Sequence, residues 1–323
     1  MKIGIMVVYF GQFPSYFNLF LKSCRANPKF NWIIISDNIS HYDYPTNVKL
    51  INMSFEDCQA VIQEKFDFEI SLLNPSKICD YKCAYGYIFS KYLHEFDWWG
   101  HCDLDQIFGN LSSFITDEKL KKYDKIYALG HLTLYRNTNE NNVRFMSKLY
   151  GRERYREVFS TDKGCAFDEW LPGNVNEIFM NNGVCAFYGN DGADIDPYHY
   201  DFRLMRYDIK QKMYIRDSIR NSIFMWKNGT LYQVYKYNGT IEKKEFAYIH
   251  LQKRKMRDKR MRETDSFFII PNSFEDSNIN PISLIKKNLF HKIINTQWII
   301  VKYKSFMYRL KSGNWRRQNV TIK

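Results

Sequence analysis

The sequence predicts an α/β protein whose core is an open, mostly parallel sheet with helices on both faces. Residues 3–10 form a continuous apolar, β-branched run that ends at Gly11, as in a central strand buried on both faces. Strand-like and helix-like segments then alternate from the start of the chain, which is typical of strands joined by right-handed crossovers. A later apolar run, Asp97–Cys102, leads directly into Asp103-Leu104-Asp105.

The elements of the first 135 residues follow in a regular order. Apolar residues recur at helical spacing within 15–25, which predicts a helix after the first strand. A buried strand is predicted over 31–37 and a shorter strand over 48–53, with helices over 55–66 and 80–94. Residues 123–135 indicate a further strand or a hairpin.

The rest of the chain has weaker periodicity. From Arg136 to about Asp208 we expect loops and short elements that cover one end of the sheet. Hairpins are predicted over 222–237, because Asn228-Gly229 and Asn238-Gly239 are turn signals, and a last strand over 245–251. After Asn280 the apolar residues recur at three, four or seven positions, which predicts an amphipathic helix: Ile285, Leu289, Ile293, Ile300, Tyr303, Met307 and Leu310.

The charge of the chain is unevenly distributed. Its 323 residues are 45% apolar and 25% charged, which excludes a disordered chain, and the net charge is +12. Residues 281–323 contain ten Lys or Arg and no acid, and residues 251–262 contain seven Lys or Arg and one acid. The remainder has a net charge of −4, so we expect no nucleic-acid partner.

Several cellular and redox classes can be excluded from the same composition. Seven scattered cysteines without a CxxC pair predict reduced thiols in a cytoplasmic protein, and argue against a disulfide framework or a zinc site. The run at residues 3–10 lacks the flanks of a signal peptide. No run reaches the ~18 apolar residues that a membrane span needs.

The sequence WWGHCDLDQIFGN, residues 98–110, is the main candidate for chemistry. Asp103 and Asp105 are two residues apart at the end of an apolar strand, where ligands of open α/β sheets bind. Two carboxylates there can hold Mg²⁺ or Mn²⁺ that bridges to phosphate oxygens. A second pair with this spacing, Asp194-Ile195-Asp196, lies in a Gly/Asp/Pro segment and is predicted to form an Asx-rich turn.

These motifs resemble those of a known enzyme class. A mononucleotide-binding α/β half ending in DxD looks like the GT-A class of nucleotide-sugar glycosyltransferases. The segments CDYKCAYGYIF and WWGHCDLDQIFGN more narrowly resemble uncharacterised bacterial proteins found among glycosyltransferases of capsule and surface-polysaccharide assembly. The resemblance implies a GT-A-like domain over residues 1–280, with a nucleotide-binding half (1–135) and an acceptor-binding half (136–280), followed by a basic extension (281–323).

The resemblance also implies a metal and diphosphate site. Asp103 would face the ribose and the metal, Asp105 would be the stronger metal ligand, and His250 would close the metal shell. Lys253 and Lys255, in the basic run that follows His250, suit a diphosphate. The alternatives are a strand-end histidine with ordinary hydrogen bonds and a solvated start of a helix.

The nucleotide itself is expected at the first strand ends, where Val8, Tyr9, Phe10 and Asp37 would form the wall that binds the base. Asp37 is equally explained as a loop or helix-cap residue. Further along, Lys82 is expected to reach a phosphate, and Asp80, with Lys77 beside it, a ribose or donor-sugar hydroxyl. A helix cap is the alternative for Asp80.

The acceptor side is predicted in FDEW, residues 167–170. Asp168 or Glu169 would take the proton from the acceptor hydroxyl in an inverting transfer, and in a retaining enzyme they would hold substrate hydroxyls. Trp170 would stack on a sugar ring. His131 and Arg136, in HLTLYRN, would line the donor-sugar pocket; an edge strand with polar ends is the alternative.

Together these features predict a metal-dependent glycosyltransferase that uses a UDP-sugar and a glycan or lipid-linked acceptor. The basic tail is expected to bind an anionic membrane surface from the cytoplasmic side, or else to pack on the body or on a second copy. A non-catalytic membrane-surface or nucleic-acid-binding protein is the alternative function. A hydrolase is a third, but it usually places its carboxylates across a cleft, which Asp103 and Asp105 cannot do alone.

Overall fold

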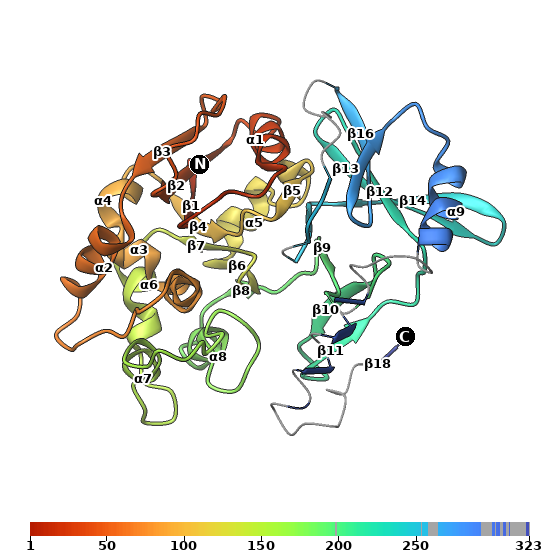
Figure 1. Ribbon diagram of the computed structural model, residues 1–323. Coiled ribbons are helices and arrows are strands. Elements are labelled where there is room, and N and C mark those ends of the chain that lie inside the picture. The colour runs from red at the N-terminus through yellow and green to blue at the C-terminus, as the bar shows by residue number, and fades with distance from the viewer. Residues whose placement is uncertain are drawn as a thin grey trace. The chain divides into compact units, whose positions relative to one another are not determined.

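A computed structural model gives the fold of the chain (Figure 1). The structure describes residues 1–197, 199–252, 254–257, 264–291, 299–300, 302–303, 306–307, 310 and 321–322. The chain divides into two compact units. Unit 1 contains residues 1–13, 27–104 and 115–189, and unit 2 contains residues 14–26, 105–114 and 190–323. The predicted halves, 1–135 and 136–280, stay a prediction.

Unit 1 is built on a seven-stranded sheet in the order β3-β2-β1-β4-β7-β6-β8. The pairs β1–β2, β2–β3, β1–β4 and β6–β8 are parallel, whereas β7 is antiparallel to both β4 and β6. The prediction of an α/β protein with an open, mostly parallel sheet is therefore confirmed. The strands are β1 (Ile3–Val8), β2 (Phe30–Ser36), β3 (Val48–Asn52), β4 (Trp98–Cys102), β6 (Lys125–Leu129), β7 (Leu132–Arg136) and β8 (Ala186–Phe187).

Short helices of unit 1 pack on this sheet. They are α2 (Phe55–Gln63), α3 (Tyr85–Ile88), α4 (Ser90–Leu93), α5 (Asp117–Lys122), α6 (Asn139–Val143), α7 (Arg154–Phe159) and α8 (Val175–Asn181), with 3₁₀ turns η1 (Pro75–Ala84) and η3 (Arg144–Met146). Met6 and Ile33 of the strands share one buried core with Ile62 of α2, Ile88 of α3 and Phe179 of α8.

The single helix predicted over 80–94 is wrong. The chain forms η1, α3 and α4 in succession instead. Lys77, Asp80 and Lys82 of η1 are all buried. The aromatic spacing of this segment did not reveal that these polar residues are buried.

Unit 2 contains two smaller sheets. One has the order β18-β11-β10-β9-β15-β5 and the other β14-β13-β12-β16-β17. Their strands are β5 (Gln106–Phe108), β9 (Gly192–Ile195), β10 (Leu204–Asp208), β11 (Met213–Arg216), β12 (Ile223–Lys227), β13 (Thr230–Tyr237), β14 (Thr240–Phe246), β15 (Tyr248–His250), β16 (Ser266–Ile270), β17 (Ser273–Asp276) and β18 (Thr321–Ile322). The unit also holds α1 (Phe17–Arg25), η2 (Leu111–Ser113) and α9 (Pro281–His291).

The hairpin turns predicted for unit 2 and the predicted start of its last helix are observed. Asn228-Gly229 joins β12 to β13 and Asn238-Gly239 joins β13 to β14, and all four residues have positive φ, as two-residue hairpin turns require. The predicted helix after Asn280 begins at Pro281. Its continuation through residues 292–298 lies outside the described residues.

Two predictions about the chain as a whole can be compared with the structure. All seven cysteines are free thiols, as expected. Among the described residues, no helix combines the length and the apolar character needed to cross a bilayer.

Candidate active site

The DxD motif lies where the chain passes from one unit to the other. β4 ends at Cys102. The two residues that follow, Asp103 and Leu104, still belong to unit 1, and Asp105 begins a segment of unit 2. Each carboxylate has its own set of partners. We call Lys82, Asp103, Asp168 and Gly130 the lysine cluster, and Asp105, Asp194, His250 and Gln252 the histidine cluster.

The lysine cluster is organised by one buried ammonium group. Lys82 Nζ lies 2.7 Å from Asp103 Oδ1 and 3.3 Å from Asp168 Oδ2, and donates to the Gly130 carbonyl at 3.0 Å. Burial opposes its charge, but Asp103 and Asp168 outweigh burial and raise the pKa of Lys82 above its usual range. Lys82, predicted to reach a phosphate, is instead committed to two carboxylates.

Gly130 brings the second half of this cluster together. It forms the two-residue turn between β6 and β7 with His131, and its N–H donates to Glu169 Oε1 at 3.1 Å. A Cβ atom on Gly130 would lie 2.0 Å from Asp168 Oδ2, so only glycine allows this approach. Asp168 is buried, which raises its pKa, while Lys82 offsets part of that shift.

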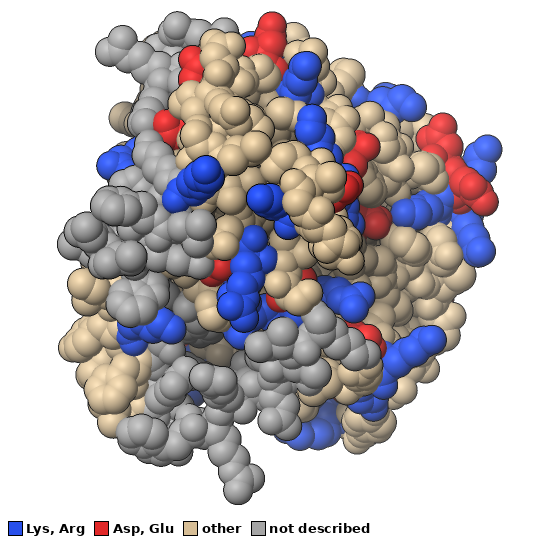
Figure 2. Space-filling view, turned by 90° about the vertical axis from the view of Figure 1, so that its right-hand side faces the viewer, with Lys and Arg blue, Asp and Glu red and all other residues tan. Residues whose placement is uncertain are grey.

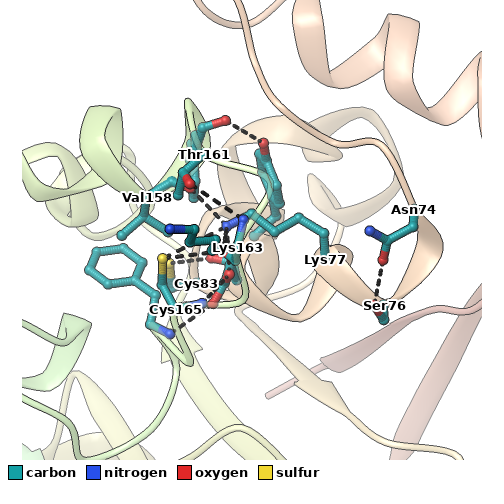
Figure 3. A network of polar contacts seen from close by, with 12 residues as sticks. Asn74, Ser76, Lys77, Cys83, Val158, Thr161, Lys163 and Cys165 are labelled. Carbon is teal, nitrogen blue, oxygen red and sulfur yellow. Dashed lines mark hydrogen bonds and ion pairs between the residues drawn. The ribbon is translucent and has the colours of Figure 1, made fainter. Parts of the chain in front are cut away.

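Lys77 and Asp80 hold the loop that carries Asp168. Lys77 Nζ lies 2.8 Å from Asp80 Oδ2 and donates to the carbonyls of Val158 and Lys163 at 2.9 and 2.6 Å (Figure 3). Asp80 in turn accepts from the backbone N–H groups of Cys165 and Phe167, both at 2.9 Å. Lys77 and Asp80 were predicted to contact ribose or donor sugar. They are buried and bind the backbone of unit 1, so we assign them a positioning role.

The antiparallel pairing of β7 separates the two residues predicted to line the donor-sugar pocket. The His131 carbonyl accepts from the Asp103 N–H at 3.3 Å, so His131 lies at the Asp103 end of β4. Arg136 pairs with Trp98 at the start of β4 and binds Asp124 at 2.8 Å. Four strand residues span about 13 Å. The prediction for Arg136 is therefore wrong.

The strand ends predicted to bind the base do meet. Asp37, after β2, accepts from the Gly11 N–H through Oδ1 at 2.8 Å, and Asn38 donates to the Gly11 carbonyl at 3.0 Å. Gly11 has a φ of 97°, which glycine adopts without strain. Val8 is buried in the sheet, whereas Tyr9 and Phe10 are half-buried and Asp37 is exposed. These contacts leave the base-binding role a prediction.

The histidine cluster is assembled by three neighbouring strands of unit 2. β15 pairs with β5, which places His250 opposite Gln106, and with β9, which places His250 opposite Asp194. His250 Nδ1 lies 2.8 Å from Asp194 Oδ1, and His250 Nε2 lies 3.3 Å from Asp105 Oδ1. Gln252 Nε2 also donates to Asp194 Oδ1, at 2.6 Å.

Asp194 is the main correction to the sequence analysis. The predicted Asx-rich turn around Asp194-Ile195-Asp196 is wrong, because residues 192–195 form the buried strand β9. Asp194 binds His250, and Asp196 forms an ion pair with Arg216 at 2.5 Å. The DxD spacing was visible in the sequence, but the pairing of β9 with β10 and β15, which places Asp194 opposite His250, was not.

The histidine cluster fits a divalent metal ion. When Nδ1–H donates to Asp194, the lone pair of Nε2 is available on the side where Asp105 Oδ1 lies, 3.3 Å away. Neighbouring ligand atoms of an octahedral ion with bonds of ~2.1 Å are separated by about 3 Å. An imidazole nitrogen with a carboxylate oxygen suits Mn²⁺. Burial opposes protonation of His250, but Asp105 and Asp194 raise its pKa well above the usual range.

The residues of the basic run after His250 differ in their exposure. Lys253 lies outside the described residues, and Lys255 is exposed. Arg254 is buried and donates to the carbonyls of Tyr200 and His199 at 3.1 and 2.5 Å. Among the described members of this run, Lys255 and Arg257 are exposed and Arg254 is not, so Lys255 has the exposure that its predicted diphosphate contact needs.

Sequence reasoning missed Gly130, Asp194, Gln252 and the buried Lys125. The possible hairpin over residues 123–135 was the one available signal for Gly130. Lys125 donates to the Tyr127 carbonyl at 2.6 Å and to Asn176 Oδ1 at 2.7 Å. Nothing in the local sequence distinguishes it from an exposed lysine.

Comparison with known proteins gives a family and a set of similar structures. Residues 5–278 match a family of unknown function (DUF6625), so the chain belongs to that family. No curated protein matches the sequence. The galactosyltransferase LgtC in complex with donor and acceptor sugar analogues is similar at 10% identity and a TM-score of 0.33, over 61% of this chain and 77% of that one. Mouse xyloside xylosyltransferase 1, in its apo form, is similar at 8% identity and a TM-score of 0.40, over 61% and 88%.

Proposed function

We propose that this member of a family of unknown function is a metal-dependent glycosyltransferase. It would move a sugar from a nucleotide sugar, a UDP-sugar by the resemblance of its motifs, to a glycan or lipid-linked acceptor in surface-polysaccharide or capsule assembly. One observation carries the proposal. The buried imidazole of His250 is fixed by Asp194 at Nδ1, and its Nε2 lies 3.3 Å from Oδ1 of Asp105, the second carboxylate of the DxD motif.

Asp105 and His250 would hold Mn²⁺ or Mg²⁺, and Asp194 would fix the tautomer and the ring orientation of His250. When bound, the ion stabilises the negative charge of a departing nucleoside diphosphate. Asp103 precedes Asp105 by two residues, which span at most about 7 Å, so the chain spacing allows its predicted contact with the same ion. Lys255 would contact the diphosphate, and Lys253 is predicted to do the same.

On the acceptor side, Glu169 is the better candidate for the general base. Asp168 is buried and ion-paired with Lys82, whereas Glu169 is half-buried and held at Oε1 by the Gly130 N–H. A base must reach the hydroxyl whose proton it takes, so the more accessible carboxylate is favoured. Trp170, beside Glu169, contacts the Tyr188 ring at 5.6 Å and would stack on the acceptor sugar.

The decisive experiment measures nucleoside diphosphate release from a panel of UDP-sugars with Mn²⁺, with and without EDTA. We expect metal-dependent release by the wild type and loss of at least a hundredfold in Asp105→Asn. Asp265→Asn, which changes an exposed aspartate of unit 2, is the matched control and should keep full activity. Equal release by the wild type and Asp105→Asn, or no UDP binding by either, would refute the proposal.

We further propose that the C-terminal segment places the enzyme on the cytoplasmic face of a membrane. Its described apolar residues Ile299, Tyr303 and Phe306 are more than half exposed and recur at helical spacing. Segment 281–323 has ten basic residues and no acid, which suits anionic lipid. On the face drawn in Figure 2, by contrast, Lys and Arg side chains are interspersed with acidic ones over the described residues.

Vesicle sedimentation tests this attachment. The wild type should sediment with vesicles that contain anionic lipid and stay in solution with zwitterionic ones. Replacing Tyr303 and Phe306 by serine should weaken that binding at least tenfold, whereas Tyr237→Ser, at an equally exposed tyrosine of β13, should not. Equal binding by all three proteins would exclude this role for the segment.

A further inference from the structure

β6 contains a bulge that lies immediately before Gly130. Ile126 is opposite Leu134 and Leu129 is opposite Leu132, so two residues of β6 stand against one residue of β7. Tyr127, within the bulge, has a φ of 69°, which is the left-handed region and is unfavourable for a residue with a side chain. Such a conformation persists only where surrounding contacts hold it.

Two buried side chains supply those contacts. The bulge takes the carbonyls of Tyr127 and Ala128 out of the regular ladder, and each finds a side-chain donor. Lys125 Nζ donates to the Tyr127 carbonyl at 2.6 Å, and Asn176 Nδ2 donates to the Ala128 carbonyl at 2.9 Å. Lys125 Nζ also donates to Asn176 Oδ1 at 2.7 Å, which joins the two donors. All the polar groups of this arrangement therefore support one another.

The same arrangement reaches the loop of Asp168 from the other side. Asn176 lies in the first turn of α8, and Val175, before it, donates its N–H to the Phe167 carbonyl at 3.0 Å. On the side of β6, the chain continues from the bulge to Gly130, whose N–H binds Glu169 and whose Cα faces Asp168. The bulge and the FDEW segment are thus tied together at two points.

We infer that Lys125 is a positioning residue, which together with Asn176 fixes the β6 bulge and thereby sets Gly130 against Asp168 and Glu169. Its effect on sugar transfer rests on the proposed function, whereas its effect on the bulge does not. The prediction that follows is selective. Loss of Lys125 should disturb the lysine cluster and Glu169, and leave the histidine cluster unchanged.

The surroundings of Lys125 explain why a lysine is used without a carboxylate. Its side chain is fully buried, and among the described residues no ion pair to it is found. The rings of Tyr135, Phe179 and Tyr188 lie 5.3 to 5.9 Å from Nζ and favour a cation or an amine. Burial lowers the pKa of Lys125 to about 7, with Cys83 opposing the shift, and both protonation states can donate the two hydrogen bonds.

The test is amide hydrogen exchange across residues 126–131 in the full chain, comparing the wild type with Lys125→Met. The control is Lys49→Met, at an exposed lysine of β3. We expect exchange in this segment to accelerate at least tenfold in Lys125→Met, with β9 and β15 unchanged. Asn176→Ala, which removes the other donor, should give the same pattern, and it replaces Lys125→Met if that variant does not fold.

Activity gives the second readout. In Lys125→Met we expect kcat for sugar transfer to fall at least tenfold, with the Kd for Mn²⁺ and for UDP unchanged. Unchanged exchange in residues 126–131, or an equal loss of Mn²⁺ affinity, would overturn the inference. A wild type without transferase activity would instead refute the proposed function, and the exchange experiment would still decide whether Lys125 holds the bulge.

Discussion

The lysine cluster and the histidine cluster each place one basic side chain between two carboxylates, but the side chain differs. In unit 1, Lys82 lies between Asp103 and Asp168, at 2.7 and 3.3 Å. In unit 2, His250 lies between Asp105 and Asp194, at 3.3 and 2.8 Å. An ammonium group has protons to donate and no lone pair, whereas an imidazole can keep a proton on one nitrogen and offer the other to a metal. Lys82 is therefore a fixed cation between two carboxylates, whereas His250 has a nitrogen that suits a metal ion.

The strongest way to break this comparison is to remove the lysine. Lys82→Met leaves Asp168 buried without its cation, and breaking a buried pair in this way costs about 3 to 5 kcal/mol of unfolding free energy. Urea denaturation measures the loss. Lys91→Met, at an exposed lysine of α4, is the control and should stay within about 0.5 kcal/mol of the wild type. A loss below 1 kcal/mol for Lys82→Met would show that Lys82 does not act as a fixed cation.

The second lysine of unit 1 sharpens the comparison through pH. Lys125 has a pKa of about 7 when folded, because it is buried, and about 10.4 when unfolded. Between these values the unfolded state binds up to one proton more, so stability should rise with pH by up to ~1.4 kcal/mol per unit, or about 2 kcal/mol from pH 7 to 9. Below pH 7 the folded state carries the full cost of burying the charged ammonium of Lys125. Lys125→Met should remove this slope, which denaturation at several pH values would show; an identical slope in both proteins would contradict the prediction.

A smaller effect, on Mn²⁺ affinity, should distinguish Asp194 in β9 from Asp196, which follows that strand. Asp194→Asn should weaken Mn²⁺ binding 10- to 100-fold, because Asp194 orients the imidazole from outside the ligand shell. Asp196→Asn is the matched control, since Asp196 binds Arg216 rather than His250. It should lower stability and leave Mn²⁺ affinity unchanged. Titration calorimetry with Mn²⁺ distinguishes them, and equal affinities in all three proteins would exclude a metal at His250.

The sequence was sufficient for the elements that are defined by local pattern. The strands β1, β2 and β4 were predicted because a strand buried on both faces needs a continuous apolar run, and β3, at the edge of the sheet, was predicted as a shorter strand. The hairpin turns at Asn228-Gly229 and Asn238-Gly239 were predicted because their φ angles restrict the residue type. In both cases the physical cause lies within a few residues of the element itself.

The failures concern residues whose role depends on a distant partner. Arg136 was predicted near the site, but the direction of β7 places it at the far end of β4. Asp194 was assigned to a turn, because its pairing with β10 and with β15, which begins 54 residues later, is not visible in the local pattern. Lys77 and Asp80 were given to the substrate, although their partners in residues 158–167 lie about 80 residues along the chain. Spacing within one segment carries no information about such pairings.

The smallest predicted effect tests whether the loop of unit 1 is held for activity or only for stability. Asn174 caps α8, accepting from the N–H groups of Asn176 and Glu177, and Ser54 caps α2 by accepting from Asp57. Asn174→Ala and Ser54→Ala should each cost about 1 kcal/mol of unfolding free energy. Only Asn174 adjoins the loop that carries Asp168 and Glu169, so only its variant should also lower kcat. Equal kcat in the two variants would mean that the carboxylates of unit 1 are set by Lys82 and Gly130 alone, without help from α8.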